Sequence, residues 1–369
     1  MTRNWLKTGI TLLTRRIDGF LFGTAIAIAG IGLVILYSAT DASTARVSGQ
    51  AINLAFALCV MWVAANVSPQ HYMRWALPLF AVGVMLLVGV ALFGTVVNGS
   101  RRWLSLGITR IQPSEMMKIA VPLLLAWYFN RQSAGTIKLR DFGIAAVLIL
   151  IPVALIARQP DLGTALLIAG SGFFVLYLAG LNWKVMVLMT IVFVAMVPVV
   201  WPHLHEYQHE RVLVFLDPAR DPLGRGYHII QGTIALGSGG VLGKGWMNGT
   251  QTHLDFLPER HTDFIFAVYG EEFGLLGALL LLALYLMLIA RGFVITASAS
   301  NLFTRLLAGA ITLMFFTYAF VNMGMVSGIL PVVGVPLPLV SFGGTALVTL
   351  FLGLGMLMSI HANRKLVKS

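Results

Sequence analysis

The stretch PERHTDFIFAVYGEEFGLLGALLLLALYLMLIA, from Pro258 to Ala290, joins a charged half to an apolar half. The apolar half has about twenty residues, enough for a helix to cross roughly 30 Å of hydrocarbon. Similar runs recur along the whole chain, in which 58% of residues are hydrophobic and only 11% are charged. About a quarter of the residues of a soluble domain are charged. The sequence therefore predicts an all-α integral membrane protein rather than a membrane β-barrel, whose strands would alternate apolar and polar residues.

About ten transmembrane helices are expected, in a single polytopic membrane domain covering residues 1–369. The predicted spans are 19–38, 50–67, 75–97, 113–130, 142–157, 162–180, 185–201, 263–290, 304–326 and 343–361. One large polar loop, about residues 202–262, separates the seventh span from the eighth. The N-terminal residues contain no long apolar core and no small-residue cleavage site, so the first span is expected to be retained rather than removed as a signal peptide.

The distribution of charge predicts the orientation of the spans. Short loops rich in Lys and Arg face the cytoplasm, which places both termini there and the large loop outside. Among the acidic residues, only Asp18 and Asp141 then fall on the inner side. The net charge of +11 is scattered among loops between spans. This scatter indicates contact with anionic lipid and control of topology, and not nucleic acid binding.

Several ionisable residues lie where the eighth span begins. Thr262 is a plausible N-cap, which would put Asp263 in the first helical turn, where the helix dipole favours the ionised carboxylate. Such a carboxylate at a membrane edge can accept a proton from a hydroxyl group, or it can simply cap its helix. Glu271 and Glu272 lie two turns deeper, where structural pairing with a cation is expected.

Two more acidic residues lie at the outer starts of predicted spans. In QPSE and QPD, Glu115 and Asp161 follow a proline, which suits the first position of a helix, and Asp161 is also a candidate for substrate binding. Lys118 is three residues after Glu115, on the same helix face, so the two can form an ion pair that keeps both charges tolerable in the membrane. The pair is expected to order the helix start, and the alternative is that Lys118 contacts substrate.

Basic side chains on the same side could bind an anionic group. Arg101, Arg102 and Trp103 lie together at a membrane edge, where the arginines could hold a phosphate or contact lipid headgroups. Both interpretations stay open. The further candidates on the outer side are Arg158, Arg211, Lys244, Arg260 and His261.

Two stretches of the large loop suggest sites that their spacing does not support. GSGGVLGKG, Gly237–Gly245, lacks the glycine and the Ser or Thr of a phosphate-binding loop, so we expect flexible backbone that carries Lys244. HLHEYQHE, His203–Glu210, matches no zinc spacing, so we expect a solvated loop and assign no metal ligand there.

A segment rich in proline and glycine lies near the end of the chain. GVPLPLVSFGG, Gly334–Gly344, contains Ser341 and falls at membrane depth, where irregular backbone must be buried in protein or line a cavity. We expect it to form a wall of a substrate groove. Together, these outer-side residues indicate a substrate with an apolar tail, an anionic group and a polar head, such as a lipid-linked phosphate compound.

Five stretches together resemble one family of bacterial membrane proteins. They are RRWLSLGITRIQPSEMMKIA, QPDLGTALLI, DPLGRGYHIIQGTIALGSGGVLGKGW, GTQTHLDFLPERHTDFIFAVYGEE and GILPVVGVPLPLVSFGGTAL. They resemble the shape, elongation, division and sporulation (SEDS) family, in matching order over nearly the whole chain. The wording is closer to the elongation branch, RodA, than to the division branch, FtsW. Tyr269 departs from the family, which more often has a smaller or aliphatic residue there, so local packing is expected to differ.

The resemblance implies a ten-span peptidoglycan glycosyltransferase of the bacterial inner membrane, with its large loop and active site in the periplasm. Its substrate would be lipid II, a disaccharide-pentapeptide on undecaprenyl pyrophosphate, polymerised during cell elongation. Asp263 would be the essential aspartate, removing or orienting the proton of the acceptor 4-hydroxyl in an inverting displacement. Outer arginines, with a divalent cation (Mg or Mn) as an optional contributor, would stabilise the leaving undecaprenyl pyrophosphate.

The resemblance also implies partners: a class B penicillin-binding protein, which is a transpeptidase, and other membrane proteins of the elongation complex. Two other classes of function remain as alternatives. A lipid II flippase would need ionisable residues near the midplane and inverted repeats, whereas the charges here gather on one side. A non-enzymatic scaffold of the elongation complex would use exposed apolar helix faces and be indifferent to Asp263.

Overall fold

The computed structural model describes residues 16–97, 100–105, 110–132, 137–203, 206–221, 224–253, 257 and 259–364. Every predicted span overlaps a long helix. The long helices are α2 (Gly19–Ala39), α3 (Thr44–Asn66), α4 (Pro69–Phe93), α5 (Pro113–Gln132), α6 (Leu139–Ala157), α7 (Leu162–Leu178), α8 (Trp183–Val200), α12 (Ile265–Ala297), α13 (Leu302–Val326) and α14 (Gly344–Ala362). Seven of them, α2, α3, α4, α6, α12, α13 and α14, are long and apolar enough to cross a membrane. The chain is therefore a multi-pass helical membrane protein, and the count of ten spans and the sides of the termini stay predictions.

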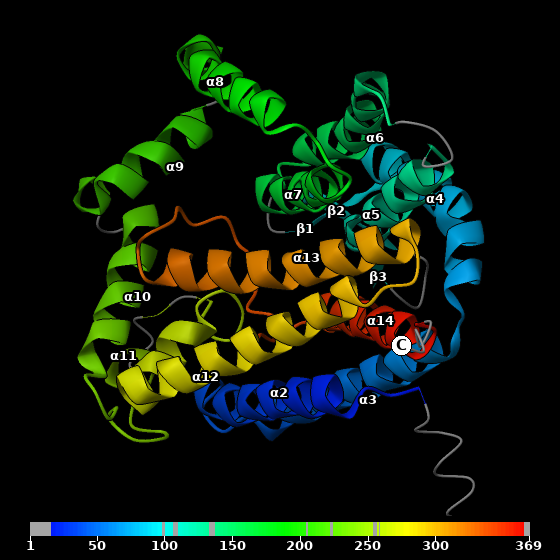
Figure 1. The fold of residues 1–369 in the computed structure, drawn as a ribbon. Coiled ribbons are helices and arrows are strands. Elements are labelled where there is room, and N and C mark those ends of the chain that lie inside the picture. The colour runs from blue at the N-terminus through cyan, green and yellow to red at the C-terminus, as the bar shows by residue number, and fades with distance from the viewer. Residues whose placement is uncertain are drawn as a thin grey trace, which may run out of the picture.

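Helix α13 forms the centre of the bundle (Figure 1). It packs against α5, α7, α12 and α14, and most of its side chains are buried. Small residues allow the closest approach: a Cβ added to Gly292 of α12 would lie 2.4 Å from the hydroxyl oxygen of Thr312 on α13. Close packing through small residues is how helices associate in a membrane, where burial of apolar surface supplies little driving force.

Helix α8 stands away from the bundle (Figure 1). None of its described side chains is buried, and most of them are apolar. In a membrane, such a helix exposes its apolar side chains to lipid on nearly all sides.

A small antiparallel sheet, which the sequence did not predict, joins α4 to α5. Its three strands are β1 (Thr95–Val97), β2 (Ser100–Ser105) and β3 (Arg110–Ile111), in the order β1-β2-β3. The prediction that the third span continues to residue 97 is wrong, because α4 ends at Phe93 and Gly94 takes an extended conformation. The β-branched residues Thr95–Val97 then suit a strand. The sheet packs against α4 and α5 through β2.

The large loop is folded. It contains η1 (Trp201–His203), α9 (Glu206–Leu216), η2 (Pro218–Arg220), α10 (Arg225–Ser238) and α11 (Thr250–His253). Helix α10 packs against α12 and α13. Figure 1 places α9, α10 and α11 at one end of the bundle and the C-terminal end of α14 at the other.

Residues 239–245 fill a break in α12 at Gly274, which has φ 65° and ψ −161°. Beyond the break, the amides of Leu275 and Leu276 donate to the loop carbonyls of Gly240 (2.9 Å) and Val241 (3.2 Å). Before it, two carbonyls of α12 accept from loop amides, each at 3.0 Å. The expectation of flexible backbone here is therefore wrong, because the loop supplies hydrogen-bond partners to the backbone groups that the break leaves without a partner in the helix.

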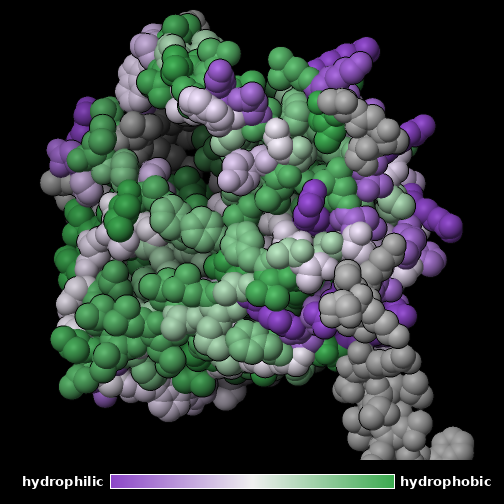
Figure 2. Space-filling model, viewed as in Figure 1, coloured by the Kyte–Doolittle hydropathy of each residue, from purple (hydrophilic) through white to green (hydrophobic). Residues whose placement is uncertain are grey.

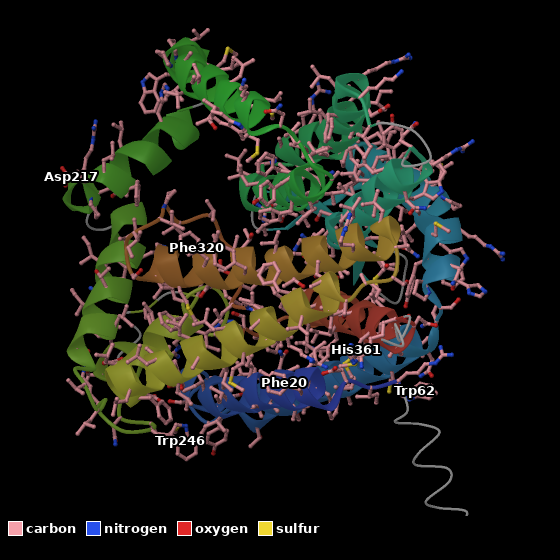
Figure 3. The ribbon with its side chains drawn as sticks, viewed as in Figure 1. Phe20, Trp62, Asp217, Trp246, Phe320 and His361 are labelled. Atoms are coloured by element: carbon pink, nitrogen blue, oxygen red, sulfur yellow. The ribbon has the colours of Figure 1, made fainter. Side chains whose placement is uncertain are left out.

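The opposite end of the bundle is held by an ion cluster. Asp18 caps α2 by accepting from the amide of Leu21 at 2.9 Å. Arg291 of α12 pairs with the Asp18 carboxylate at 2.5 Å, and His361 of α14, labelled in Figure 3, lies 3.4 Å from it. Figure 2 shows that the surface over α12 and α13 is largely apolar, whereas hydrophilic side chains gather toward the end where α14 ends.

Candidate functional site

Asp263 lies in a turn that precedes α12. The turn closes when the amides of Thr262 and Phe264 donate to the Glu259 carbonyl, at 3.0 and 3.2 Å. The N-cap residue is Phe264, and no side chain caps the helix. The prediction that Thr262 caps the helix and that Asp263 occupies its first turn is therefore wrong, since the chain becomes helical only at Ile265.

The proline- and glycine-rich segment holds this turn in place. The carbonyl oxygens of residues 261, 262 and 263 accept, in that order, from the Phe342 amide (3.0 Å), the Ser341 hydroxyl (2.6 Å) and the Asn322 amide nitrogen Nδ2 (2.8 Å). Three successive carbonyls are thus anchored, two by the segment itself and one by α13. Ser341, a predicted substrate-binding residue, is engaged with the backbone on both sides, because its hydroxyl oxygen also accepts from the Leu337 amide at 2.8 Å.

Side chains from three helices support the irregular backbone of the segment. The carbonyl of Val335 accepts from Asn322 of α13 at 2.7 Å, and that of Pro338 accepts from the Tyr285 hydroxyl of α12 at 2.5 Å. Gln50 of α3 donates to the Ser341 carbonyl at 3.2 Å. Such partners are what non-helical backbone requires at membrane depth. The segment borders Asp263, and its expected role as a wall of a substrate groove stays a prediction.

Asp263 faces a cavity of about 200 Å3. Its lining residues are Val214, His228, Ile229, Glu259, Asp263, Phe264 and Val332. An imidazole and two carboxylates therefore meet on a largely apolar wall. Sequence reasoning missed His228 and Glu259; Glu259 stands four residues before Asp263 in the same motif, but His228 carries no local signal.

Burial raises the pKa of the Asp263 carboxyl to about 6, and the negative charge of Glu259 contributes in the same direction. Arg102 acts in the opposite direction, so its guanidinium lies within electrostatic range. The expectation that a helix dipole would favour the ionised form is thus corrected, because Asp263 is outside the helix and partly buried. Burial also lowers the pKa of His228, which keeps its imidazole neutral at pH 7.

Arg102 connects the small sheet to α7. Its Nη2 donates to the carbonyl of Pro160 at 2.9 Å, and its Nε lies 3.6 Å from the Asp161 carboxylate. Asp161 also caps α7 by accepting from the Thr164 amide at 3.2 Å. Two predicted substrate residues, Arg102 and Asp161, therefore form one structural contact beside Asp263. The side chains of Arg101 and Arg211 lie outside the described residues, and Trp103 is partly buried on β2.

The predicted pair of Glu115 and Lys118 is confirmed as an ion pair, with 2.6 Å between Nζ and Oε1. Both side chains are buried, and Lys118 Nζ also lies 5.0 Å from the ring centroid of Tyr318 on α13. The pair thus joins the start of α5 to the central helix.

Two other predicted binding residues are engaged elsewhere. Lys244 pairs at 2.6 Å with Glu271, which confirms the structural pairing expected for that glutamate. Arg260 pairs with Asp41 at 2.6 Å and also donates to the Thr252 carbonyl. These contacts connect α11 and the turn to the helices, and a direct role in binding substrate stays a prediction for both basic residues.

His261 lies beside the segment, with its ring centroid 6.1 Å from that of Phe342. Burial and the positive charge of Arg46 lower the pKa of its imidazole. Arg158 follows α6 as its C-cap residue.

The described residues contain no group of three or more His, Cys, Asp or Glu side chains that could hold a metal ion. Most side chains of His203–Glu210 lie outside the described residues, whereas the His209 ring lies 4.7 Å from the Trp201 ring between centroids, with the two planes tilted by 33°. The divalent cation stays a prediction.

Comparison with known proteins identifies relatives over nearly the whole chain. The family model described as cell cycle protein, of FtsW, RodA and SpoVE, matches residues 19–366. The peptidoglycan glycosyltransferase MrdB of Escherichia coli strain K12 is 52% identical over 335 residues, which cover 90% of each chain. A probable peptidoglycan glycosyltransferase FtsW of Geobacter metallireducens is 32% identical over 368 residues, covering 95% of this chain and 96% of the relative.

Solved structures share the fold. One comes from work on the structural coordination of polymerization and crosslinking by a peptidoglycan synthase complex; it has a TM-score of 0.82 and 33% identity, and covers 93% of this chain and 97% of the other. The crystal structure of the rod shape determining protein RodA of Thermus thermophilus has a TM-score of 0.72 and 28% identity, covering 94% and 97% of the two chains.

Proposed function

The chain belongs to the FtsW, RodA and SpoVE family of cell cycle proteins, and we propose that this peptidoglycan glycosyltransferase polymerises lipid II with Asp263 as its catalytic base. The observation that carries the proposal is the position of Asp263. Its carboxylate faces a cavity lined in part by α9 and α10, beside a segment whose carbonyls accept hydrogen bonds from side chains of three helices. A carboxyl with a pKa of about 6 is mostly ionised at pH 7 and still basic enough to take a proton.

The reaction follows from this placement. Asp263 accepts the proton of the acceptor sugar 4-hydroxyl as that oxygen attacks the anomeric carbon of the donor. The bond from the anomeric carbon to the pyrophosphate oxygen breaks, and undecaprenyl pyrophosphate leaves with the electron pair. A single displacement inverts the anomeric centre, so an α-linked donor gives a β-1,4 product. The negative charge of Glu259 disfavours ionisation of Asp263, so it raises the pKa of that carboxyl and makes it a stronger base.

Arg102 is the described cation best placed to act on the leaving group, because it lies within electrostatic range of Asp263 and its side chain is partly exposed. Its positive charge would stabilise the charge that develops on the pyrophosphate. A Mg or Mn ion is proposed as an optional contributor with no protein ligand assigned, because a metal-bound Asp263 carboxylate would have a lowered pKa and could not act as the base. Such an ion would add positive charge at the pyrophosphate.

An apolar cavity of about 170 Å3 between α7 and α13 suits part of the lipid tail. The lining of this apolar cavity includes Leu330, Pro331, Val333 and Val335. Val332, in the same stretch, lines the cavity that Asp263 faces. A tail held there would leave its pyrophosphate and sugars near Asp263. We propose this arrangement for the donor, with the active site on the periplasmic side of the inner membrane.

For the partner, we propose a class B penicillin-binding protein. The similar solved structure comes from work on the coordination of polymerization and crosslinking by a peptidoglycan synthase complex, which supports a crosslinking partner for this chain. Other proteins of the elongation complex are proposed as neighbours in the membrane. The elongation role is supported by the 52% identity to MrdB.

One experiment separates the enzyme from the flippase and the scaffold. The protein is purified with its transpeptidase partner and given labelled lipid II in detergent, and both glycan polymer and released undecaprenyl pyrophosphate are measured. Wild type should produce both, and Asp263→Ala should produce neither. Asp217→Ala is the matched control, because Asp217 is an exposed aspartate of the large loop (Figure 3). Polymer from Asp263→Ala would remove Asp263 from the chemistry, and polymer from none of the three would favour transport or scaffolding.

A further inference from the structure

We propose that Asn322 is the residue that positions Asp263 for the reaction, an inference that rests on the role proposed above for Asp263. Asn322 belongs to α13 and is fully buried. Its Nδ2 donates to two backbone carbonyls, that of Asp263 at 2.8 Å and that of Val335 at 2.7 Å. One amide nitrogen therefore connects the turn that carries the base to the segment that faces it.

The orientation of this amide is determined by its partners. Both partners are carbonyl oxygens, which only accept hydrogen bonds, so both bonds must come from the NH2 group of Asn322. The oxygen Oδ1 is then left buried, with no hydrogen-bond partner among the residues that the structure describes. A buried carbonyl without a partner costs stability, so a leucine of similar size would suit this position better if only packing mattered. The two donated bonds are what the asparagine contributes.

These bonds determine the geometry around the carboxylate. Val335 follows Gly334, and a Cβ added to Gly334 would lie 3.3 Å from Asp263 Oδ2. Asn322 thus holds the backbone of Asp263 and the backbone of Val335, the residue after the glycine that lies beside the Asp263 carboxylate. The other anchors of the turn, Ser341 and the Phe342 amide, belong to the far end of the segment, so the contact from α13 is a separate one.

Loss of the amide would leave both carbonyls without this donor and allow the turn and the segment to move apart. Proton transfer to Asp263 depends on a donor–acceptor distance within hydrogen-bond reach. A displacement of about 1 Å can lower a rate by about a hundredfold, whereas binding of a large substrate depends on many other contacts. We therefore expect Asn322→Leu to lower kcat by about tenfold or more and to change the KM for lipid II by less than about threefold.

The test uses the complex with its transpeptidase partner and compares wild type, Asn322→Leu, Asn130→Leu and Asp263→Asn. Asn130 of α5 is the matched control: it is a partly buried asparagine whose Oδ1 accepts from the amide of Phe303, at the other end of α13. For each protein, kcat, the KM for lipid II, the pH profile of kcat and the thermal unfolding midpoint are measured.

The proposal expects Asn322→Leu to lose far more kcat than Asn130→Leu for a comparable loss of thermal stability. The acidic limb of its pH profile should also move to lower pH, because a less constrained Asp263 becomes more hydrated. A kcat equal to that of Asn130→Leu, or a low kcat with an unmoved limb, overturns the positioning role.

If Asn322→Leu does not fold, Asn322→Asp replaces it. A protonated carboxyl can donate one of the two bonds, so the ratio of its kcat to that of wild type should rise as the pH falls. A ratio that does not change with pH overturns the proposal. Full activity of Asp263→Asn would instead refute the proposed function itself, so the two failures are distinguishable.

Discussion

Gly334 and Asp263 meet across the site: Gly334 has φ 72°, and a Cβ built on it would lie 3.3 Å from Asp263 Oδ2. A backbone in the left-handed region favours glycine. The absence of a side chain at Gly334 therefore leaves the space beside the carboxylate open, which is where an acceptor hydroxyl must approach.

We expect Gly334→Ala to lower kcat by about tenfold, because the methyl group crowds the carboxylate and displaces the acceptor. Steady-state polymerisation of lipid II measures the effect. Gly328→Ala is a closely matched control, since Gly328 has φ 75° and the one contact of its Cβ within the described part of the chain would be Thr233 Cγ2, at 3.2 Å. The two variants should lose similar stability; a similar loss of kcat in both would show that backbone strain, and not proximity to Asp263, is responsible.

The rate should depend on pH through Asp263. The base acts in its ionised form, so kcat falls as protons neutralise it. With a pKa of about 6, the rate should halve near pH 6 and fall about tenfold for each further unit of acidity. A profile of kcat from about pH 5 to 8 measures this limb, and a rate that stayed constant to about pH 4.5 would contradict the raised pKa.

Two neighbouring charges should shift this limb in opposite directions. Glu259→Gln removes a negative charge, which lowers the pKa of Asp263 and moves the acidic limb of the profile to lower pH. Arg102→Gln removes a positive charge, which raises the pKa of Asp263 and moves the limb to higher pH. The same pH profiles measure both shifts. Arg102→Gln should also lower kcat at its plateau, if the guanidinium stabilises the leaving group. Shifts in one common direction would be incompatible with this arrangement.

The break in α12 should not tolerate a side chain. Gly274→Ala places a Cβ 2.3 Å from the amide nitrogen of Gly243, in a backbone conformation that itself costs about 1–3 kcal/mol for other residues. Its thermal unfolding midpoint should drop by several degrees. In contrast, Gly30→Ala in α2 should be neutral or slightly stabilising, because among the described residues only the backbone of its own helix turn lies near the added Cβ, and alanine favours helix by about 1 kcal/mol. Equal midpoints would show that the loop can move aside.

The apolar runs were sufficient to predict the long helices, because crossing a membrane imposes a length and a composition that are visible locally. The same reasoning found the pair of Glu115 and Lys118, whose spacing of three residues is a property of one helix. Asp263 was also predicted as a functional residue from its position at a helix start, but the N-cap expected at Thr262 is wrong because the helix begins at Ile265.

The features that the sequence did not reveal depend on contacts between distant segments. Asn322 is 59 residues from Asp263 and looks like any polar residue in an apolar helix. Lys244 was a predicted substrate-binding residue because its partner Glu271 is 27 residues away along the chain, and no local pattern links the two. The docking of residues 239–245 into the break at Gly274 also depends on two distant segments. The glycines of the loop do not indicate a partner in the helix, and the sequence of the helix does not indicate a break that the loop would fill.

The central claim is that the ionised carboxylate of Asp263 removes the proton of the acceptor hydroxyl. Its most direct test is the single-turnover rate of glycan formation by Asp263→Asn, measured with the complex in saturating excess over lipid II. The amide keeps the size of the side chain but cannot accept the proton in the same way, so the rate should fall by about 10²–10⁴-fold while lipid II still binds. A rate within about threefold of wild type would contradict the claim.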